Sequence, residues 1–335
     1  AEEFPDKINF DRDQVRVMNI DIEVYSADGF PDPGKAAHPV TSISIRKNDG
    51  NYWVWSCGDY EVTREDVLYI KCDNEMDLLR KFIEHWSHYA PDILTGWNTR
   101  FFDIPYIVNR CYNLWGDDTL LKRLSPWGAV RERNVTIQGR ANQEYVIEGV
   151  EHLDYIEIFK KFTLNTLGQQ ESYRLDHIAH VVLGERKLSY EEHGNLHALY
   201  ENDFQKFIDY NIKDVELVHK IDEKLDLITL VLTMAYRGGV NYGDTLGTTN
   251  IWDTIIYRML NKMKVNRMPK AAVYAPTHMG GLNYKSFQTL QDQKGILTML
   301  QHFRWNKTVA NDMLVTLSAI QLMSGLCKPI LQDTT

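Results

Sequence analysis

The chain contains 335 residues, of which 44% are hydrophobic and 25% are charged, a composition that supports one large domain with a sizeable core plus smaller appendages. No apolar run reaches the roughly 18 residues of a membrane-spanning helix, and the acidic start lacks the basic region of a signal peptide, so we expect a cytoplasmic protein without membrane contacts. The net charge of −9 argues against a protein that coats nucleic acid by bulk electrostatics, but it is compatible with an enzyme that holds a few nucleotides.

Strands and helices alternate in the first part of the chain. The predicted strands are rich in Val, Ile, Tyr and Trp between turn-forming residues, and they cover residues 14–25, 39–47, 51–57 and 91–97. One predicted helix covers residues 73–89, with Asp73 or Asn74 as its N-cap. A second covers residues 103–115 and is opened by Asp103 and Pro105. An aspartate just before Ile-Pro is an ordinary helix N-cap, which is the structural interpretation of Asp103.

The second part of the chain is mainly helical. A two-stranded insertion is predicted near residues 129–149, and helices follow at residues 154–162, 172–183, 199–225, 225–237 and 250–264. Three strands followed by alternating helices and strands indicate a mixed central sheet flanked by helices. We therefore expect an α/β fold in which the order of elements is that of a ribonuclease H-like core, followed by a C-terminal helical appendage.

Carboxylates interrupt the most apolar of these strands. Asp21 and Glu23 lie two residues apart in a run that otherwise reads as a buried strand, so their side chains share a face with Cα atoms about 6.6 Å apart. Burying two unpaired carboxylates costs several kcal/mol each, which favours a divalent metal as their partner. Tyr210 and Asp214 share one face of a predicted helix. Strand-end carboxylates and a solvated helix face are the structural alternatives.

Three sequence segments occur together in a recognisable order. Asn-Ile-Asp-Ile-Glu-Val at 19–24, Gly-Trp-Asn-Thr-Arg-Phe-Phe-Asp-Ile-Pro at 96–105 and Tyr-Asn-Ile-Lys-Asp-Val at 210–215 resemble the three exonuclease motifs of family B DNA polymerases. The resemblance is strongest to the replicative polymerases of T-even-type bacteriophages and extends over roughly residues 10–275. It implies a ribonuclease H-like (DnaQ-like) exonuclease domain and a protein that works in the cytoplasm of a phage-infected bacterial host.

The resemblance assigns roles to the acidic residues. It implies that Asp21, Glu23, Asp103 and Asp214 are the acidic quartet of a proofreading 3′–5′ exonuclease of the tyrosine subtype, with Tyr210 as the tyrosine. By this analogy Asp21, Glu23 and Asp214 bind a first metal, Asp21 bridges to a second, and Asp103 acts mainly through a bound water. Hard oxygen ligands suit two Mg²⁺ or Mn²⁺ ions. With its ordinary pKa near 10, Tyr210 is expected to orient the attacking water as a hydrogen-bond donor.

Further residues match the family's contacts to the substrate. Lys187 corresponds to a lysine that steadies the scissile phosphate or the leaving oxygen, and its alternative is a solvated surface lysine. Phe30, Asn98 and Phe102 correspond to contacts with the single-stranded 3′ end of DNA. Phe102 fits a core position equally well.

No zinc site is predicted. The four cysteines lie far apart without a Cys-x-x-Cys pair, so neither a zinc ribbon nor a disulfide framework is indicated. His177 and His180, or His193 and His197, have helical spacing but lack partners in a recognised pattern, and we interpret them as solvated or capping histidines.

The resemblance also divides the chain. We expect residues 1–13 to be the remnant of a preceding domain, 14–225 the exonuclease domain, 226–280 a helical linker toward a polymerase palm, and 281–335 a divergent helical tail that could dock onto a partner. The palm motifs of family B polymerases are missing from the sequence, so we expect either a subunit of a split polymerase with a separate palm-bearing subunit, or a fragment of a longer chain. The alternative functions are an RNA-trimming exonuclease with the same site and a catalytically idle DNA-binding module.

Overall fold

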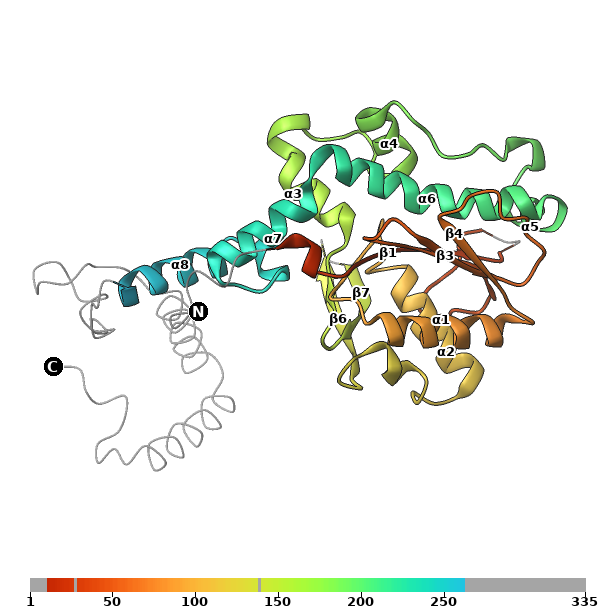
Figure 1. The fold of residues 1–335 in the computed structure, drawn as a ribbon, viewed down its shortest axis with the longest axis horizontal. Coiled ribbons are helices and arrows are strands. Elements are labelled where there is room, and N and C mark those ends of the chain that lie inside the picture. The colour runs from red at the N-terminus through yellow and green to blue at the C-terminus, as the bar shows by residue number, and fades with distance from the viewer. Residues whose placement is uncertain (1–10, 27–28, 138–139, 263–335) are drawn as a thin grey trace, which may run out of the picture. The chain divides into compact units, whose positions relative to one another are not determined.

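The computed structural model describes residues 11–26, 29–137 and 140–262. Its centre is a six-stranded sheet with the strand order β4-β3-β2-β1-β5-β8 (Figure 1). In chain order these strands are β1 (Val17–Val24), β2 (Val40–Lys47), β3 (Tyr52–Ser56), β4 (Val67–Lys71), β5 (Ile93–Thr95) and β8 (Glu151–His152). The predicted strands at 14–25, 39–47, 51–57 and 91–97 are confirmed, whereas β4 and β8 were not predicted.

The sheet is mixed, as predicted. β2 runs antiparallel to both β1 and β3, while β5 runs parallel to β1 and to β8, and β4 runs parallel to β3. The insertion near residues 129–149 is a separate two-stranded hairpin of β6 (Val130–Ile137) and β7 (Arg140–Ile147).

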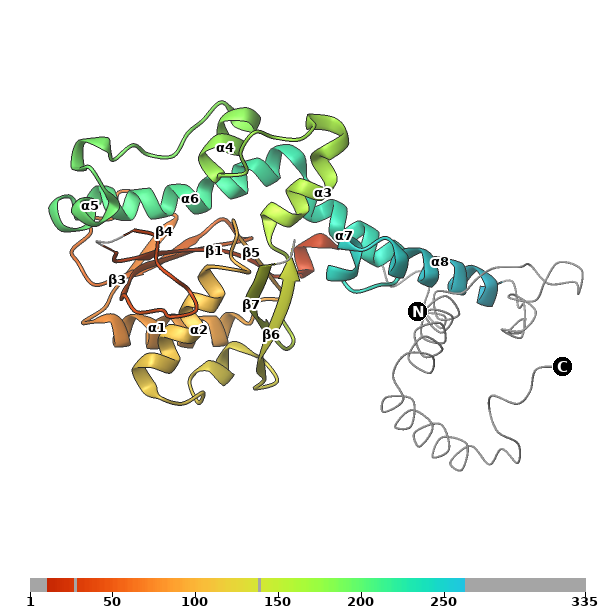
Figure 2. The ribbon, with the colours of Figure 1, turned by 180° about the vertical axis from the view of Figure 1, so that it is seen from behind.

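Helices cover both faces of the sheet (Figures 1 and 2). α1 (Glu75–Tyr89) and α2 (Asp103–Trp115) lie on one face, and α4 (Leu175–Leu183) and α6 (Phe204–Leu225) lie on the other. The described chain also contains α3 (Tyr155–Leu167), α5 (Leu196–Asn202), α7 (Leu227–Gly238), α8 (Thr249–Lys262) and the short 3₁₀ turns Arg12–Gln14, Leu121–Leu124, Glu191–His193 and Gly243–Leu246.

The prediction of one continuous helix over residues 199–225 was wrong. The chain breaks between α5 and α6 at Asp203, whose side chain accepts a hydrogen bond from the Lys206 N–H at 3.0 Å and so caps the start of α6. An aspartate that satisfies an N–H of a new first turn favours a helix start over continuation of the preceding helix.

The direction of alternate side chains in β1 divides the core into two layers. Met18, Ile20 and Ile22 are buried in the cluster that β1 shares with α1 and α2, where Trp55, Phe82 and Trp86 also lie. The residues between them, Asn19, Asp21 and Glu23, therefore face α6 on the other side. Each fully buried aliphatic side chain contributes about 1.5–3 kcal/mol, so the apolar residues set the register that aims the carboxylates at α6.

The chain separates into two compact units, Ala1–Ile256 and Tyr257–Thr335. All elements up to α7 belong to the first unit. Residues 1–10 and the expected helical tail at 281–335 lie outside the described residues, and the proposed division of the chain stays a prediction. No helix in the described ranges combines the length and the apolar character needed to cross a membrane.

Candidate active site between strand β1 and helix α6

Three carboxylates from two elements come together between the sheet and α6. Asp21 and Glu23 project from β1, and Asp214 projects from the middle of α6. One carboxylate oxygen from each lies within 4.8 Å of the others. The sequence indicated that Asp21 and Glu23 share a strand face and that Tyr210 and Asp214 share a helix face. The packing of α6 on β1 and β2 brings these two faces together.

Asp103 follows the C-terminal end of β5 and contacts the same strand, β1. Its Oδ1 accepts a hydrogen bond at 2.9 Å from the backbone N–H of Ile22, the residue between Asp21 and Glu23. That N–H is available because β5 pairs with β1 only at Val17–Asn19. Asp103 therefore lies beside the three carboxylates without being one of the converging group.

The N-cap interpretation of Asp103 was wrong. α2 begins at Asp103, the capping position is Phe102, and no side chain caps the helix there. The Asp103 carboxylate is directed to the Ile22 N–H instead of to its own helix. Because the Asp103 carboxylate is buried, it needs a hydrogen-bond partner inside the protein, and the Ile22 N–H of β1 is that partner.

Burial raises the pKa of every carboxyl group in the site. Desolvation raises the pKa of Glu23 to about 8 and that of Asp103 to about 7. The pKa of Asp21 rises well above its ordinary value through burial and then through the charges of Asp214 and Glu23, and burial also raises the pKa of Asp214. Four acidic groups that resist ionisation in one place are characteristic of a site built for a cation.

The residues present fit a divalent metal. Asp214 Oδ1 is buried and has no hydrogen-bond partner among the described residues, and a buried oxygen without a partner is a costly arrangement unless a ligand completes it. The donor atoms are all carboxylate oxygens, which are the ligands that Mg²⁺ and Mn²⁺ prefer. Asp21, Glu23 and Asp214 are thus suited to hold such an ion.

Lys187 enters the site as its internal cation. Its ammonium forms an ion pair with Asp214 Oδ2 and donates to the Tyr210 hydroxyl at 3.2 Å. Its backbone N–H is anchored on Asp176 at 3.0 Å. The Lys187 side chain is only 27% exposed, so the alternative of a solvated surface lysine was wrong.

Tyr210 lies one helical turn before Asp214 and is buried. Desolvation, followed by the charge of Asp214, raises its pKa above the ordinary value. The phenol therefore stays protonated at neutral pH and can donate a hydrogen bond, but cannot act as a base.

Asn211 is a residue of the site that the sequence analysis missed. It is 0% exposed, and its Nδ2 donates to Asp21 Oδ2 at 2.7 Å. Its Oδ1 accepts from the Ser42 hydroxyl at 2.8 Å and the Ser44 hydroxyl at 2.5 Å. Ser42 and Ser44 lie two residues apart, on one face of β2, and isoleucines alternate with them. This row of polar side chains on a strand was the available sequence signal for a polar partner such as Asn211.

Comparison of the sequence with known proteins identifies the family of this chain. Residues 2–178 match the family described as DNA polymerase family B, exonuclease domain. The match covers more than half of the chain. The chain belongs to DNA polymerase family B. This match ends before Lys187, Tyr210 and Asp214, so it does not include these three residues of the site.

Those relatives include two phage polymerases. The DNA-directed DNA polymerase of Escherichia phage RB69 is 35% identical over 282 residues, which are 76% of this chain and 31% of the relative. That of Enterobacteria phage T4 is 34% identical over 286 residues, or 78% and 31%. DNA polymerase 1 of Sulfurisphaera ohwakuensis is 29% identical over 216 residues, or 62% and 22%. The chain spans about a third of the length of the phage relatives that it matches. An exonuclease domain is a nuclease, so the matched domain is that of a hydrolase.

The family B residues expected to contact DNA lie in two loops. Phe30 is 82% exposed, and its ring lies 4.9 Å from the ring of Phe102. Phe102 is half-buried and packs against the core cluster that contains residues of α1 and α2, so it contacts both the core and Phe30. Asn98 adopts a left-handed backbone conformation with φ of 67° in the loop between β5 and α2.

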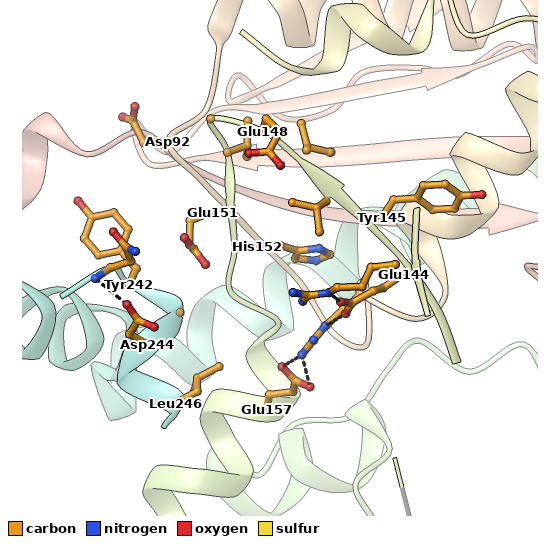
Figure 3. A pocket seen from close by; sticks show the side chains of 18 of the residues that line it. Asp92, Glu144, Tyr145, Glu148, Glu151, His152, Glu157, Tyr242, Asp244 and Leu246 are labelled. Atoms are coloured by element: carbon orange, nitrogen blue, oxygen red, sulfur yellow. Dashed lines mark hydrogen bonds and ion pairs between the residues drawn. The ribbon is translucent and has the colours of Figure 1, made fainter. Parts of the chain in front are cut away.

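A separate cavity of about 1440 Å³ lies between the β6–β7 hairpin, β8, α3 and residues 241–246 (Figure 3). None of the four candidate metal-binding carboxylates lines it. One wall is an ion-pair network in which the Arg100 guanidinium contacts Glu144 and Glu157. Arg100 belongs to the same loop as Asn98, between β5 and α2. The cavity wall therefore includes part of the loop that leads to Asp103.

Proposed function

We propose that this chain is the proofreading 3′–5′ exonuclease part of a family B DNA polymerase, which hydrolyses the 3′-terminal phosphodiester of single-stranded DNA with two divalent metal ions. The observation that supports it is the convergence of Asp21, Glu23 and Asp214, together with a buried Asp214 oxygen that has no hydrogen-bond partner in the part of the chain that the structure describes. The mixed sheet with helices on both faces supports the further proposal of a ribonuclease H-like core.

The ligands are proposed from the resemblance to family B exonucleases, and the convergence of Asp21, Glu23 and Asp214 supports the first set. These three residues would hold one Mg²⁺ or Mn²⁺, Asp21 would also contribute to the second, and Asp103 would act mainly through a bound water. When bound, the ions supply Lewis-acid stabilisation of the attacking and leaving oxygens of phosphodiester hydrolysis.

The chain's own groups orient the reactants. Asn211 holds the Asp21 carboxylate in one orientation through the 2.7 Å hydrogen bond. Tyr210, kept protonated by burial, donates a hydrogen bond that orients the attacking water. Lys187 carries the positive charge nearest to Asp214 and steadies the phosphate once its ion pair opens. Phe30 and Phe102 present aromatic surface on which a terminal base stacks.

The division of labour within the protein is also a proposal. Residues 14–225 form the exonuclease domain and residues 226–280 lead toward the polymerase palm, which is carried by another part of the complete protein or by a separate subunit. The chain matches 31% of the length of each phage polymerase. This coverage supports the proposal that the complete polymerase has further domains.

Digestion of end-labelled oligonucleotides tests this function. We expect the chain to shorten 5′-labelled single-stranded DNA from its 3′ end with Mg²⁺ and to leave it intact with EDTA. Asp21→Ala and Asp103→Ala should each abolish digestion, whereas Asp59→Ala, which alters an exposed ion pair with Lys71, should not. Digestion in EDTA, or full activity in both site variants, would overturn the proposal. Faster digestion of an RNA of the same sequence would favour the RNA-trimming function instead.

A further inference from the structure

One buried carboxylate outside the metal site holds the loop that leads to Asp103. Asp154 precedes α3 and is 0% exposed. Its Oδ1 accepts the N–H of Asn98 at 3.0 Å and its Oδ2 accepts the N–H of Arg100 at 2.9 Å. Oδ1 also accepts the Ile156 N–H at 3.2 Å, which makes Asp154 the N-cap of α3. A single side chain thus joins the start of a helix to two backbone donors 54 or more residues earlier in the chain.

The loop between β5 and α2 needs such a restraint. Asn98 has a positive φ of 67°, in a left-handed region that few residues other than glycine and asparagine adopt. Gly96 leaves no room for a side chain, because a Cβ there would lie 2.5 Å from the backbone oxygen of Ile20. The strained turn brings the loop against β1 and then opens α2 at Asp103, and strained backbone persists only where surrounding contacts determine it.

Side chains of the loop are held as firmly as its backbone. The buried Thr99 hydroxyl lies 2.9 Å from His152 Nε2 on β8. The Arg100 guanidinium contacts Glu157 of α3 at 2.8 Å and forms an ion pair with Glu144 of β7. Figure 3 shows Glu144, Glu157 and His152 on the wall of the cavity behind the loop.

We propose that Asp154 is a positioning residue of the exonuclease site, which fixes the loop carrying Asn98 so that Asp103 reaches the backbone of β1. This inference rests on the proposed function. Asp154 acts through Asp103 and Asn98 and makes none of the contacts within the converging carboxylates. Two acceptor oxygens are required, because the Asn98 and Arg100 N–H groups are bound by different oxygens of one carboxylate.

Asp154→Asn separates the positioning role from the capping role. Asparagine caps a helix as well as aspartate does, but its side chain has one acceptor oxygen, so either the Asn98 or the Arg100 N–H loses its partner. Asp154→Ser is the second variant, because serine also caps α3 and is too short to bind both loop donors. Asp203→Asn is the matched control, since Asp203 caps α6 at the Lys206 N–H without holding this loop.

The experiment combines turnover, metal binding and backbone exchange. In Asp154→Asn we expect kcat on single-stranded DNA to fall about 10- to 100-fold, the range for residues that orient metal ligands. The Kd for Mn²⁺ in titration calorimetry should change less than twofold at the Asp21–Glu23–Asp214 site. Hydrogen exchange should accelerate at the Asn98 and Arg100 amides but not in α6, and Asp203→Asn should leave kcat unchanged.

Two results would overturn the inference. One is a kcat within twofold of the original in both Asp154 variants although Asn98 and Arg100 exchange faster. The other is faster exchange throughout the sheet and α6 with loss of Mn²⁺ binding, which would show a purely structural role. An unsubstituted chain that fails to digest DNA would instead defeat the proposed function, and the positioning role with it.

Discussion

The ammonium of Lys187 forms an ion pair with the carboxylate of Asp214, one of the three carboxylates that converge in the site. The site therefore contains a tethered cation next to the place where a metal would bind. The Lys187 ammonium competes with a metal ion for Asp214, and its positive charge repels an incoming metal ion.

Replacing this cation should change metal binding and catalysis in opposite directions. Lys187→Met is expected to tighten Mn²⁺ binding at least about tenfold, or about 1.4 kcal/mol, and to slow DNA digestion. Calorimetric titration of Mn²⁺ and timed digestion measure the two effects. Lys71→Met, which removes an exposed ion pair with Asp59, should change neither. Weaker Mn²⁺ binding in Lys187→Met would show that the lysine supports the metal rather than competing with it.

Asn211→Ala should release the Asp21 carboxylate. Its Nδ2 donates to Asp21 Oδ2 at 2.7 Å from a fully buried position, so the variant loses the group that orients a metal ligand. We expect kcat/KM on single-stranded DNA to fall about 10- to 100-fold. Asn202→Ala, at an exposed α5 asparagine that bonds its own helix, is the control, and equal losses in the two variants would contradict the role of Asn211.

Tyr210→Phe removes only the hydroxyl that Lys187 contacts at 3.2 Å. Because burial keeps the phenol protonated, its loss removes a hydrogen-bond donor, and kcat should fall by about 10²-fold. Mn²⁺ affinity should stay within twofold. The control is Tyr60→Phe, which removes a hydroxyl bonded to Asp209 at 2.8 Å, next to Tyr210 in the chain. A kcat unchanged by Tyr210→Phe would eliminate the water-orienting role.

Phe30→Ala should weaken the grip on the DNA end. An aromatic ring that is 82% exposed and rests on Phe102 has a free face for a base, and such stacking contributes about 1–3 kcal/mol per base. We expect Kd for a short single-stranded DNA, measured by fluorescence anisotropy in EDTA, to rise about 5- to 150-fold. Trp127→Ala removes another exposed aromatic ring and tests whether any surface aromatic has this effect.

His152 should make stability depend on pH below about 6. Burial lowers its pKa to about 3 from an ordinary 6.5, so between these values the unfolded chain binds a proton that the folded chain does not. The free energy of unfolding then falls as pH falls, by up to about 1.4 kcal/mol per pH unit. Urea unfolding from pH 6 to pH 4 should show a shallower decline in His152→Gln. His88→Gln, at an exposed histidine, should follow the original slope.

The local elements and the identity of the acidic residues follow from the sequence. Alternation in β1 requires Asp21 and Glu23 to share a face, and a spacing of four residues requires Tyr210 and Asp214 to share one, because both periodicities are properties of the backbone. The positions of β1, β2, α1 and α2 were predictable for the same reason. β8 escaped prediction because a two-residue strand has no periodicity, and its pairing with β5 depends on long-range contacts.

The contacts between site residues depend on the packing of the elements. The direction of the Asp103 carboxylate toward the Ile22 N–H, the contact of Asn211 with Asp21 and the ion pair of Lys187 with Asp214 join residues 27 to 190 positions apart. Such pairings depend on how α2 and α6 pack on the two faces of the sheet, which local spacing does not encode. Backbone periodicity, which can be read from the sequence, places carboxylates on one face of β1 and on one face of α6. The packing of α6 on the sheet brings these two faces together, and burial between them raises the pKa values of the carboxyl groups, which suits the site to a cation.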